Sequence, residues 1–142
     1  MKVEQIVTKP LVAVPSGTPI LKAAKQMVEN SVGLLVVYDA KDKTKLVGVV
    51  SERDIIKSMV SGEKLTGQVD RIAVKKVVTV KAASDVAEAA KAMNKHQIRH
   101  VVVVDNQAKP VGVISMRDLV GERATLTAIL QSHEKEIFIG GD

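Results

Sequence analysis

The sequence contains no cysteine and no tryptophan, and its only aromatic side chains are Tyr38 and Phe138. Without cysteine, the chain can form no disulfide, no thiolate nucleophile and no cysteine-ligated metal site. With so few aromatic rings, it lacks the stacking platforms on which proteins bind single-stranded nucleic acids. The hydrophobic core must therefore be built from Val, Ile, Leu, Ala and Met.

Long apolar segments are also missing. No apolar run approaches the roughly 20 residues that a membrane-spanning helix needs, and residues 1–6 lack the hydrophobic region of a signal peptide. We therefore predict a soluble, cytoplasmic protein that does not interact with membranes.

Motifs for catalysis are absent as well. The sequence has no Walker A loop and no Gly-x-Gly-x-x-Gly, and neither Ser51 nor Ser115 is followed by the second glycine of a nucleophile elbow. His96 and His100 are four residues apart, but a strand is expected to begin between them, and no third metal ligand is evident. We therefore predict no enzyme activity, no catalytic cofactor and no metal site.

The charge of the chain is positive, with a formal net charge of +5 and a pI of about 9.5. This charge favours anionic partners. The basic residues are scattered and form no run of five or more, so a well-solvated, lysine-rich surface explains them as well as a phosphate-bearing ligand does.

What the sequence does contain is an internal repeat, which predicts a duplicated fold. Residues 48–54 read Gly-Val-Val-Ser-Glu-Arg-Asp, and residues 112–118 read Gly-Val-Ile-Ser-Met-Arg-Asp. Each stretch is typical of the end of a buried strand, a hydroxyl at the turn and an Asp three residues later. The match extends to residues 36–39 and 102–105, at an offset of 66, whereas Gly112 follows Gly48 by 64. The second hairpin loop is therefore two residues shorter.

The hydrophobic spacing predicts the same elements in each half. We expect strands at residues 11–14, 34–38 and 46–50 of the first half, a helix that starts at the N-cap Thr18 and a second that starts at Ser51. In the second half, residues 77–80 match residues 11–14, and Ser84 takes the N-cap position of Thr18. Each half therefore reads β-α-β-β-α.

A half of about 60 residues cannot cover both faces of its own sheet. We therefore predict an α/β (α+β) fold in which two repeats pack sheet to sheet with pseudo-twofold symmetry. The predicted boundaries are repeat 1 at residues 1–61, a linker at 62–69, repeat 2 at 70–123 and a C-terminal helical tail at 124–142.

The repeat resembles the cystathionine β-synthase (CBS) domain, and the tandem pair resembles a Bateman module. The resemblance covers roughly residues 3–120 and rests on both strand-to-helix stretches and on residues 97–105. It implies a free-standing regulatory module that binds adenosine compounds: AMP first, also ADP or ATP, with S-adenosylmethionine or a dinucleotide such as NAD as alternatives. It also implies a homodimer, a flat disc of four repeats, that reports energy or metabolite status to an unknown regulated protein.

The resemblance assigns ribose binding to four residues, Ser51, Asp54, Ser115 and Asp118. A carboxylate can accept hydrogen bonds from both ribose hydroxyls, and the helix N-terminus beside the serine favours an anion. The alternative interpretation is a capping box, in which Ser at the N-cap and an acid at N3 satisfy free backbone N–H groups. The two roles can coexist.

Phosphate binding is expected from Arg99 and His100, which the family geometry places opposite Ser51 and Asp54. Their equivalents in the first half, Gly33 and Leu34, are uncharged, so the two clefts should differ. Further candidates for phosphate binding are Arg53, Arg117 and Lys9. All of these residues are equally compatible with ordinary surface or partly buried positions.

The adenine ring needs a flat apolar slot. One cleft would supply Ile98, Val78, Val80 and Ser84, and the other would supply Thr18, Val32 and Gly33, although core packing explains most of these residues too. Two further readings stay open: a structural or interaction module with vestigial clefts, and a nucleic-acid binder suggested by the pI alone, which is the less favoured partner.

Overall fold

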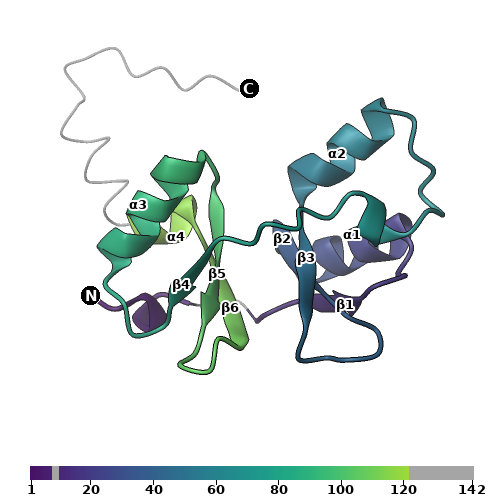
Figure 1. Ribbon diagram of the computed structural model, residues 1–142. Coiled ribbons are helices and arrows are strands. Elements are labelled where there is room, and N and C mark those ends of the chain that lie inside the picture. The colour runs from purple at the N-terminus through teal and green to yellow at the C-terminus, as the bar shows by residue number, and fades with distance from the viewer. Residues whose placement is uncertain (8–9, 122–142) are drawn as a thin grey trace, which may run out of the picture.

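The computed structural model describes residues 1–7 and 10–121 and contains two similar halves, each with one three-stranded sheet (Figure 1). The predicted tail at 124–142 and the candidate Lys9 lie outside the described residues. The elements of the first half are η1 (Val3–Gln5), β1 (Ala13–Pro15), α1 (Ile20–Glu29), β2 (Leu34–Tyr38), β3 (Leu46–Ser51) and α2 (Glu52–Val60). Those of the second are η2 (Val69–Arg71), β4 (Thr79–Lys81), α3 (Val86–His96), β5 (His100–Val104), β6 (Pro110–Ser115) and α4 (Met116–Val120).

Each sheet has one parallel and one antiparallel pair of strands. In the first half, α1 carries the chain across from β1 to the parallel strand β2, and a hairpin then leads to the antiparallel strand β3. The second half repeats this arrangement, with Thr79 opposite Val102 where the first half has Ala13 opposite Val36. The predicted β-α-β-β-α order and pseudo-twofold relation are therefore confirmed.

The first helix of each half begins one residue later than the sequence suggested. Thr18 does not cap α1, because its hydroxyl donates to the carbonyl of Pro15 at 2.7 Å. The predicted linker takes over this role, since the N–H groups of Ile20 and Leu21 donate to the carbonyls of Gly67 and Leu65. In the second half, the cap of α3 is Asp85 rather than Ser84, and its carboxylate accepts from the N–H of Ala87 at 2.9 Å.

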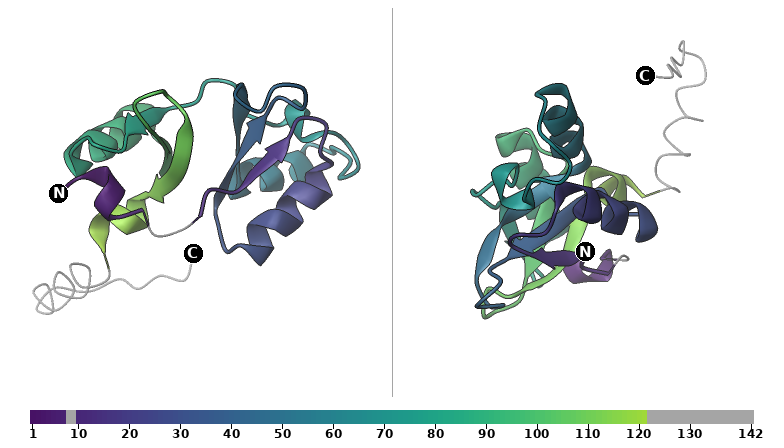
Figure 2. Two further views of the ribbon diagram at one scale, coloured as in Figure 1. Left: turned by 90° about the horizontal axis from the view of Figure 1, so that it is seen from below. Right: turned by 90° about the vertical axis from the view of Figure 1, so that its right-hand side faces the viewer.

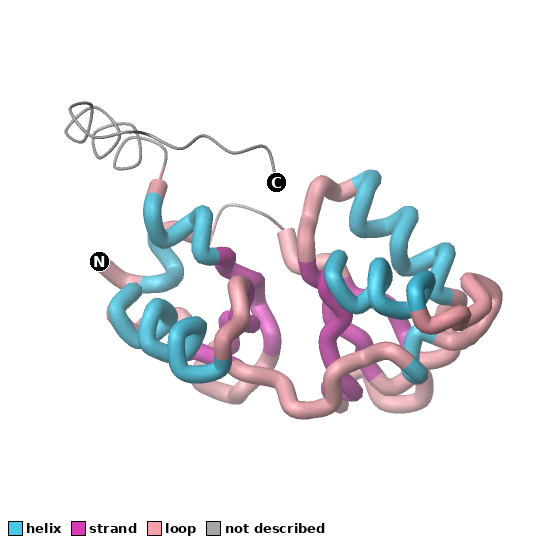
Figure 3. The backbone as a smooth tube through the Cα atoms, turned by 90° about the horizontal axis from the view of Figure 1, so that it is seen from above, coloured by secondary structure: helices cyan, strands magenta, loops and turns pink. Residues whose placement is uncertain are grey.

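The two sheets face each other across the middle of the molecule, with most helices to the outside (Figure 3). Alternate residues of the central strands make this contact: Leu34 and Val36 from β2 pack with Val102 and Val104 from β5. The opposite faces of the sheets pack against the helices of their own halves. Burial on both faces explains why β2 and residues 101–104 of β5 read as unbroken apolar runs.

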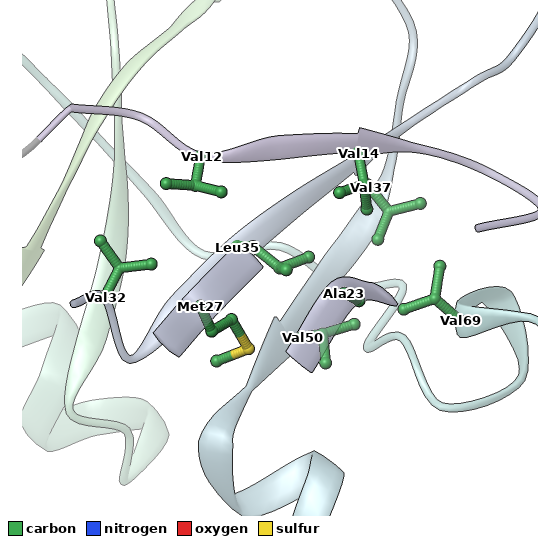
Figure 4. Packing of buried hydrophobic residues seen from close by; sticks show 9 residues of the cluster. All are labelled: Val12, Val14, Ala23, Met27, Val32, Leu35, Val37, Val50 and Val69. Atoms are coloured by element: carbon green, nitrogen blue, oxygen red, sulfur yellow. The ribbon is translucent and has the colours of Figure 1, made fainter. Parts of the chain in front are cut away.

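The leading segment of each half packs on the core of the other half. Val3 in η1 is fully buried among residues of the second half, and its N–H donates to the carbonyl of Ser84 at 2.9 Å. Val69 in η2 is fully buried in the first core (Figure 4), and its N–H donates to the carbonyl of Thr18 at 2.8 Å. In the two further views the N-terminal helix again lies beside the second half (Figure 2). The halves are thus interlocked as well as stacked.

None of the helices in the described part of the chain is both long enough and apolar enough to span a membrane.

Candidate functional site

Two adjoining pockets lie where the two halves meet. The larger cleft, of about 610 Å³, is lined by Gly33, Leu34, Val49, Ser51, Glu52, Arg53, Asp54, Ile56, Lys57, Val74, Lys76, Val77, Val78, Gln97, Ile98, Arg99, His100 and Val102. The smaller cleft, of about 210 Å³, is lined by Pro10, Val32, Gly33, Leu34, His100, Val113, Ser115, Arg117 and Asp118. Three residues, Gly33, Leu34 and His100, line both clefts.

The larger cleft combines the start of α2 with the start of β5. Ser51 and Asp54 come from the first half, and Arg99 and His100 come from the second. The antiparallel pairing of β2 with β3 places the end of β3, and hence the N-terminus of α2, beside the start of β2 at Leu34. Because the sheets stack, the start of β5 faces the same point. The structure therefore brings together the four residues that the family resemblance placed in one cleft.

The smaller cleft is the pseudo-symmetric counterpart. It contains Ser115, Arg117 and Asp118 at the start of α4, opposite Val32 and Gly33 at the start of β2. The grouping of these residues also agrees with the sequence-based expectation. The two clefts differ because Arg99 and His100 stand at the start of β5, where the start of β2 has Gly33 and Leu34.

Capping boxes hold the two acidic residues in the same way. The N–H of Ser51 donates to Oδ2 of Asp54 at 2.8 Å, and the N–H of Asp54 donates to Oγ of Ser51 at 3.2 Å. The equivalent distances for Ser115 and Asp118 are 2.8 Å and 3.3 Å. The capping interpretation is therefore confirmed for both pairs.

The capping boxes leave half of each carboxylate available. Both Asp54 and Asp118 are half-buried, and each uses Oδ2 in its box. Within residues 1–7 and 10–121, no hydrogen bond reaches Oδ1 of either side chain. A carboxylate held in this way offers a fixed acceptor at the mouth of the cleft, so capping does not prevent binding to a hydroxyl group.

Several other candidates from the sequence line the clefts. Arg53, Val78 and Ile98 line the larger cleft, with the two apolar residues half-buried, as an adenine slot would need. Arg117 and Val32 line the smaller one.

Three predicted adenine-pocket residues line neither cleft. Thr18 is buried in the turn before α1, where its carbonyl accepts from Val69. Val80 is buried in the second core, and Ser84 lies in the turn before α3, where it binds the N-terminal segment. These residues are held at the far end of the strands by the crossed packing of η1 and η2, which the sequence did not reveal.

The sequence analysis missed two lysines of the larger cleft, Lys57 and Lys76. A signal existed for Lys57, because it follows Asp54 by three residues and therefore shares its helix face. Lys76 precedes β4 as Pro10 precedes β1, and Pro10 lines the smaller cleft, but the sequence alone gave no signal for either position.

Metal binding finds no support in the part of the chain that the structure describes. Residues 1–7 and 10–121 contain no group of three or more His, Cys, Asp or Glu side chains placed to hold an ion.

Comparison with known proteins gives a family match over both halves. The family model described as "CBS domain" matches residues 3–61 and again residues 69–124. An uncharacterized 17.7 kDa protein of Acidianus ambivalens is 34% identical over 118 residues, which are 83% of this chain and 70% of that protein. The chain spans 62% of a relative from Methanopyrus kandleri and only 22% of an L-aspartate semialdehyde sulfurtransferase from Methanocaldococcus jannaschii.

Similar structures include two with adenosine ligands. A CBS domain protein of Pyrobaculum aerophilum, complexed with AMP, is 36% identical with a TM-score of 0.81; the match covers 92% of this chain and 99% of that one. The CBS domain pair of protein MJ0100, in complex with 5′-methylthioadenosine and S-adenosyl-L-methionine, is 28% identical with a TM-score of 0.75. This match covers 84% of this chain and 96% of that chain.

Proposed function

The chain belongs to the CBS domain family, and we propose that it is a regulatory module whose clefts bind adenosine-containing nucleotides, AMP foremost and also ADP or ATP. The observation that carries this proposal is that one cleft holds both a hydrogen-bond acceptor for ribose and donors for phosphate. Oδ1 of Asp54 is available for ribose hydroxyls, and Arg99 and His100 line the same pocket for phosphate. The similarity to an AMP-bound relative supports the same ligand class.

A second ligand is favoured by a specific observation. The structurally similar pair of protein MJ0100 holds 5′-methylthioadenosine and S-adenosyl-L-methionine. Both share the adenosine part with AMP but carry no phosphate. The smaller cleft, with one arginine and no other fixed cation, suits such a ligand better than the larger cleft does.

We further propose that the module acts as a homodimer and passes its ligand state to a partner protein. The helices expose apolar side chains that a monomer would leave in water: on α2, Ile56 is 61% exposed, Met59 60% and Val60 84%. Val28 on α1 is 79% exposed. An apolar surface of this kind fits an interface made by helices. Energy sensing, a cytoplasmic location, the lack of enzyme activity and the absence of nucleic acid among its partners stay predictions.

Calorimetry on the full chain tests the proposal, with AMP, ADP, ATP, S-adenosylmethionine and NAD as separate titrants. We expect at least one to bind more tightly than ~1 mM. Asp54→Ala should weaken binding in the larger cleft, and Asp118→Ala should weaken it in the smaller one. Asp42→Ala, in the loop between β2 and β3, removes a carboxylate far from both clefts and is the control.

Two results would contradict the proposal. The first is the absence of binding by every titrant. The second is wild-type affinity in both Asp54→Ala and Asp118→Ala, which would remove the ribose assignment. The thermal midpoint of each variant without ligand distinguishes two causes of weaker binding. A lowered midpoint indicates loss of the capping box, and an unchanged midpoint indicates loss of the ligand contact alone.

A further inference from the structure

The larger cleft is lined by an excess of positive charge. Four cations, Arg53, Lys57, Lys76 and Arg99, face two carboxylates, those of Glu52 and Asp54. The smaller cleft is lined by one cation, Arg117, and one carboxylate, that of Asp118. With histidine neutral, the larger cleft therefore carries a net charge of +2 and the smaller cleft none.

The difference comes from positions that the repeat makes equivalent. The strand register relates residue 76 to residue 10 and residue 99 to residue 33, and the matching capping boxes relate residue 57 to residue 121. At these positions the larger cleft has Lys76, Arg99 and Lys57. The residues equivalent to them by the repeat are Pro10, Gly33 and Gly121. One backbone geometry therefore supports two clefts of different charge.

The positive charge of the larger cleft is not neutralised within the described residues. The ion pairs found there join Arg71 to Glu63, Lys91 to Glu88 and the N-terminal amine to Asp85, so none involves a cation of the larger cleft. Asp54 is already engaged by Ser51. Like charges held around one pocket repel each other, and an anion with several charges relieves that repulsion.

Size points the same way as charge. The larger cleft has about 610 Å³ against 210 Å³ for the smaller one. Lys57 lies three residues after Asp54, about 4.5 Å further along the same face of α2. A ribose bound at Asp54 would therefore leave room and positive charge for more than one phosphate, and lysine side chains can follow a flexible phosphate chain as adaptable point charges.

We propose that the two clefts sort nucleotides by their number of phosphates. The larger cleft takes an adenosine ligand with two or three phosphates, and Lys57 and Lys76 bind the phosphates beyond the first. The smaller cleft takes an adenosine ligand with one phosphate or none. This inference rests on the proposed function and adds to it which residues determine specificity.

The test compares ATP, AMP and inorganic tripolyphosphate as titrants of the full chain, in buffer with EDTA so that no divalent ion masks the phosphates. The variant is Lys57→Gln/Lys76→Gln, which keeps polar side chains of nearly the same length while removing two charges. The matched control is Lys41→Gln/Lys43→Gln, which removes two charges from the loop after β2. Loss of two charge-assisted contacts should weaken ATP binding about tenfold or more, with AMP affinity changed less than about threefold and the control unchanged.

The outcomes separate this inference from the proposed function. Equal losses of ATP and AMP affinity, or an equal loss of ATP affinity in the control, would overturn the sorting while leaving nucleotide binding intact. If tripolyphosphate binds in a manner that needs Lys57 and Lys76 but no adenosine compound binds, the phosphate site stands and the proposed function fails. If no titrant binds, both are wrong.

Discussion

The ring of His100 lies directly against the backbone of Gly33. A β-carbon on residue 33 would stand 2.9 Å from Nε2 of His100, closer than real β-carbons approach other atoms, and 3.2 Å from Cε1, which is a tight contact. Both residues line both clefts. The wall between the clefts therefore includes one imidazole ring, and a glycine at position 33 gives that ring its place.

Gly33→Ala should change both clefts at once. The added methyl group forces the His100 ring to rotate, because the backbone of β2 is fixed between β1 and β3. We expect AMP and ATP affinities to fall together, by about three- to tenfold, which corresponds to roughly 1 kcal/mol of strain. Calorimetry measures the affinities, and the thermal midpoint checks that the fold is retained.

A double-mutant cycle supplies the control for this prediction. His100→Ala removes the ring that the new methyl group would meet, so Gly33→Ala should have little further effect in that background. If the two substitutions act additively, the contact between residues 33 and 100 does not set the shape of the clefts.

Much of this fold could be predicted from the sequence because its signals are local. The unbroken apolar runs at Leu34–Tyr38 and at residues 101–104 mark strands buried on both faces, and the two Ser-x-x-Asp stretches mark helix starts. The offset between the halves then predicted the pairing of the clefts. The grouping of Arg99 with Asp54 was implied by the resemblance to the CBS domain, and both residues line the larger cleft.

The missed features depend on contacts between distant segments. The cap of α1 comes from the carbonyls of Leu65 and Gly67, which no local pattern around Thr18 could indicate. The pocket position of Lys76 likewise depends on how the second half stacks on the first. Val80 is buried in the second core, and Ser84 lies in a turn that binds the N-terminal segment, so neither lines a cleft. Both positions depend on contacts with residues distant in the sequence.

The crossed packing of η1 predicts a long-range effect of Val3→Ala. Val3 precedes the first half in sequence, yet its side chain is fully buried in the core of the second. The truncation should cost about 1–3 kcal/mol in the free energy of unfolding. Hydrogen exchange should show a larger loss of protection at Val101–Val103 in β5 than in β2.

Val69→Ala is the matched variant for the first half. Val69 is fully buried in the first core, so the pattern of lost protection should reverse, with β2 more affected than β5. Equal losses in both strands for both variants would show that the leading segments do not stabilise the opposite halves selectively.

The equivalent glycines Gly48 and Gly112 should differ in their tolerance of alanine. A β-carbon on Gly48 would stand 2.7 Å from the carbonyl oxygen of Val74, which is fixed because it accepts from the N–H of Val49 at 3.0 Å. A β-carbon on Gly112 would stand 2.7 Å from a methyl carbon of Val7, a side chain that can move. Denaturant unfolding should show a loss of about 1–3 kcal/mol for Gly48→Ala and under about 1 kcal/mol for Gly112→Ala. Similar losses would contradict this explanation.

Asp85 should make the stability of α3 depend on pH. The hydrogen bond from the N–H of Ala87, with the nearby amine of Met1, lowers the pKa of Asp85 below its ordinary value of 3.8. A carboxyl group whose pKa is lower in the folded chain than in the unfolded chain stabilises the fold when the pH is above its unfolded pKa. This stabilisation is lost as the pH falls through the folded pKa. Asp85→Ala should therefore lower the thermal midpoint at pH 7, and the difference from the parent should shrink below pH 3.8. Asp85→Asn keeps a capping oxygen, so its thermal midpoint at pH 7 should fall less than that of Asp85→Ala. If the difference in thermal midpoint between the parent and Asp85→Ala stays constant down to low pH, the carboxylate charge contributes nothing.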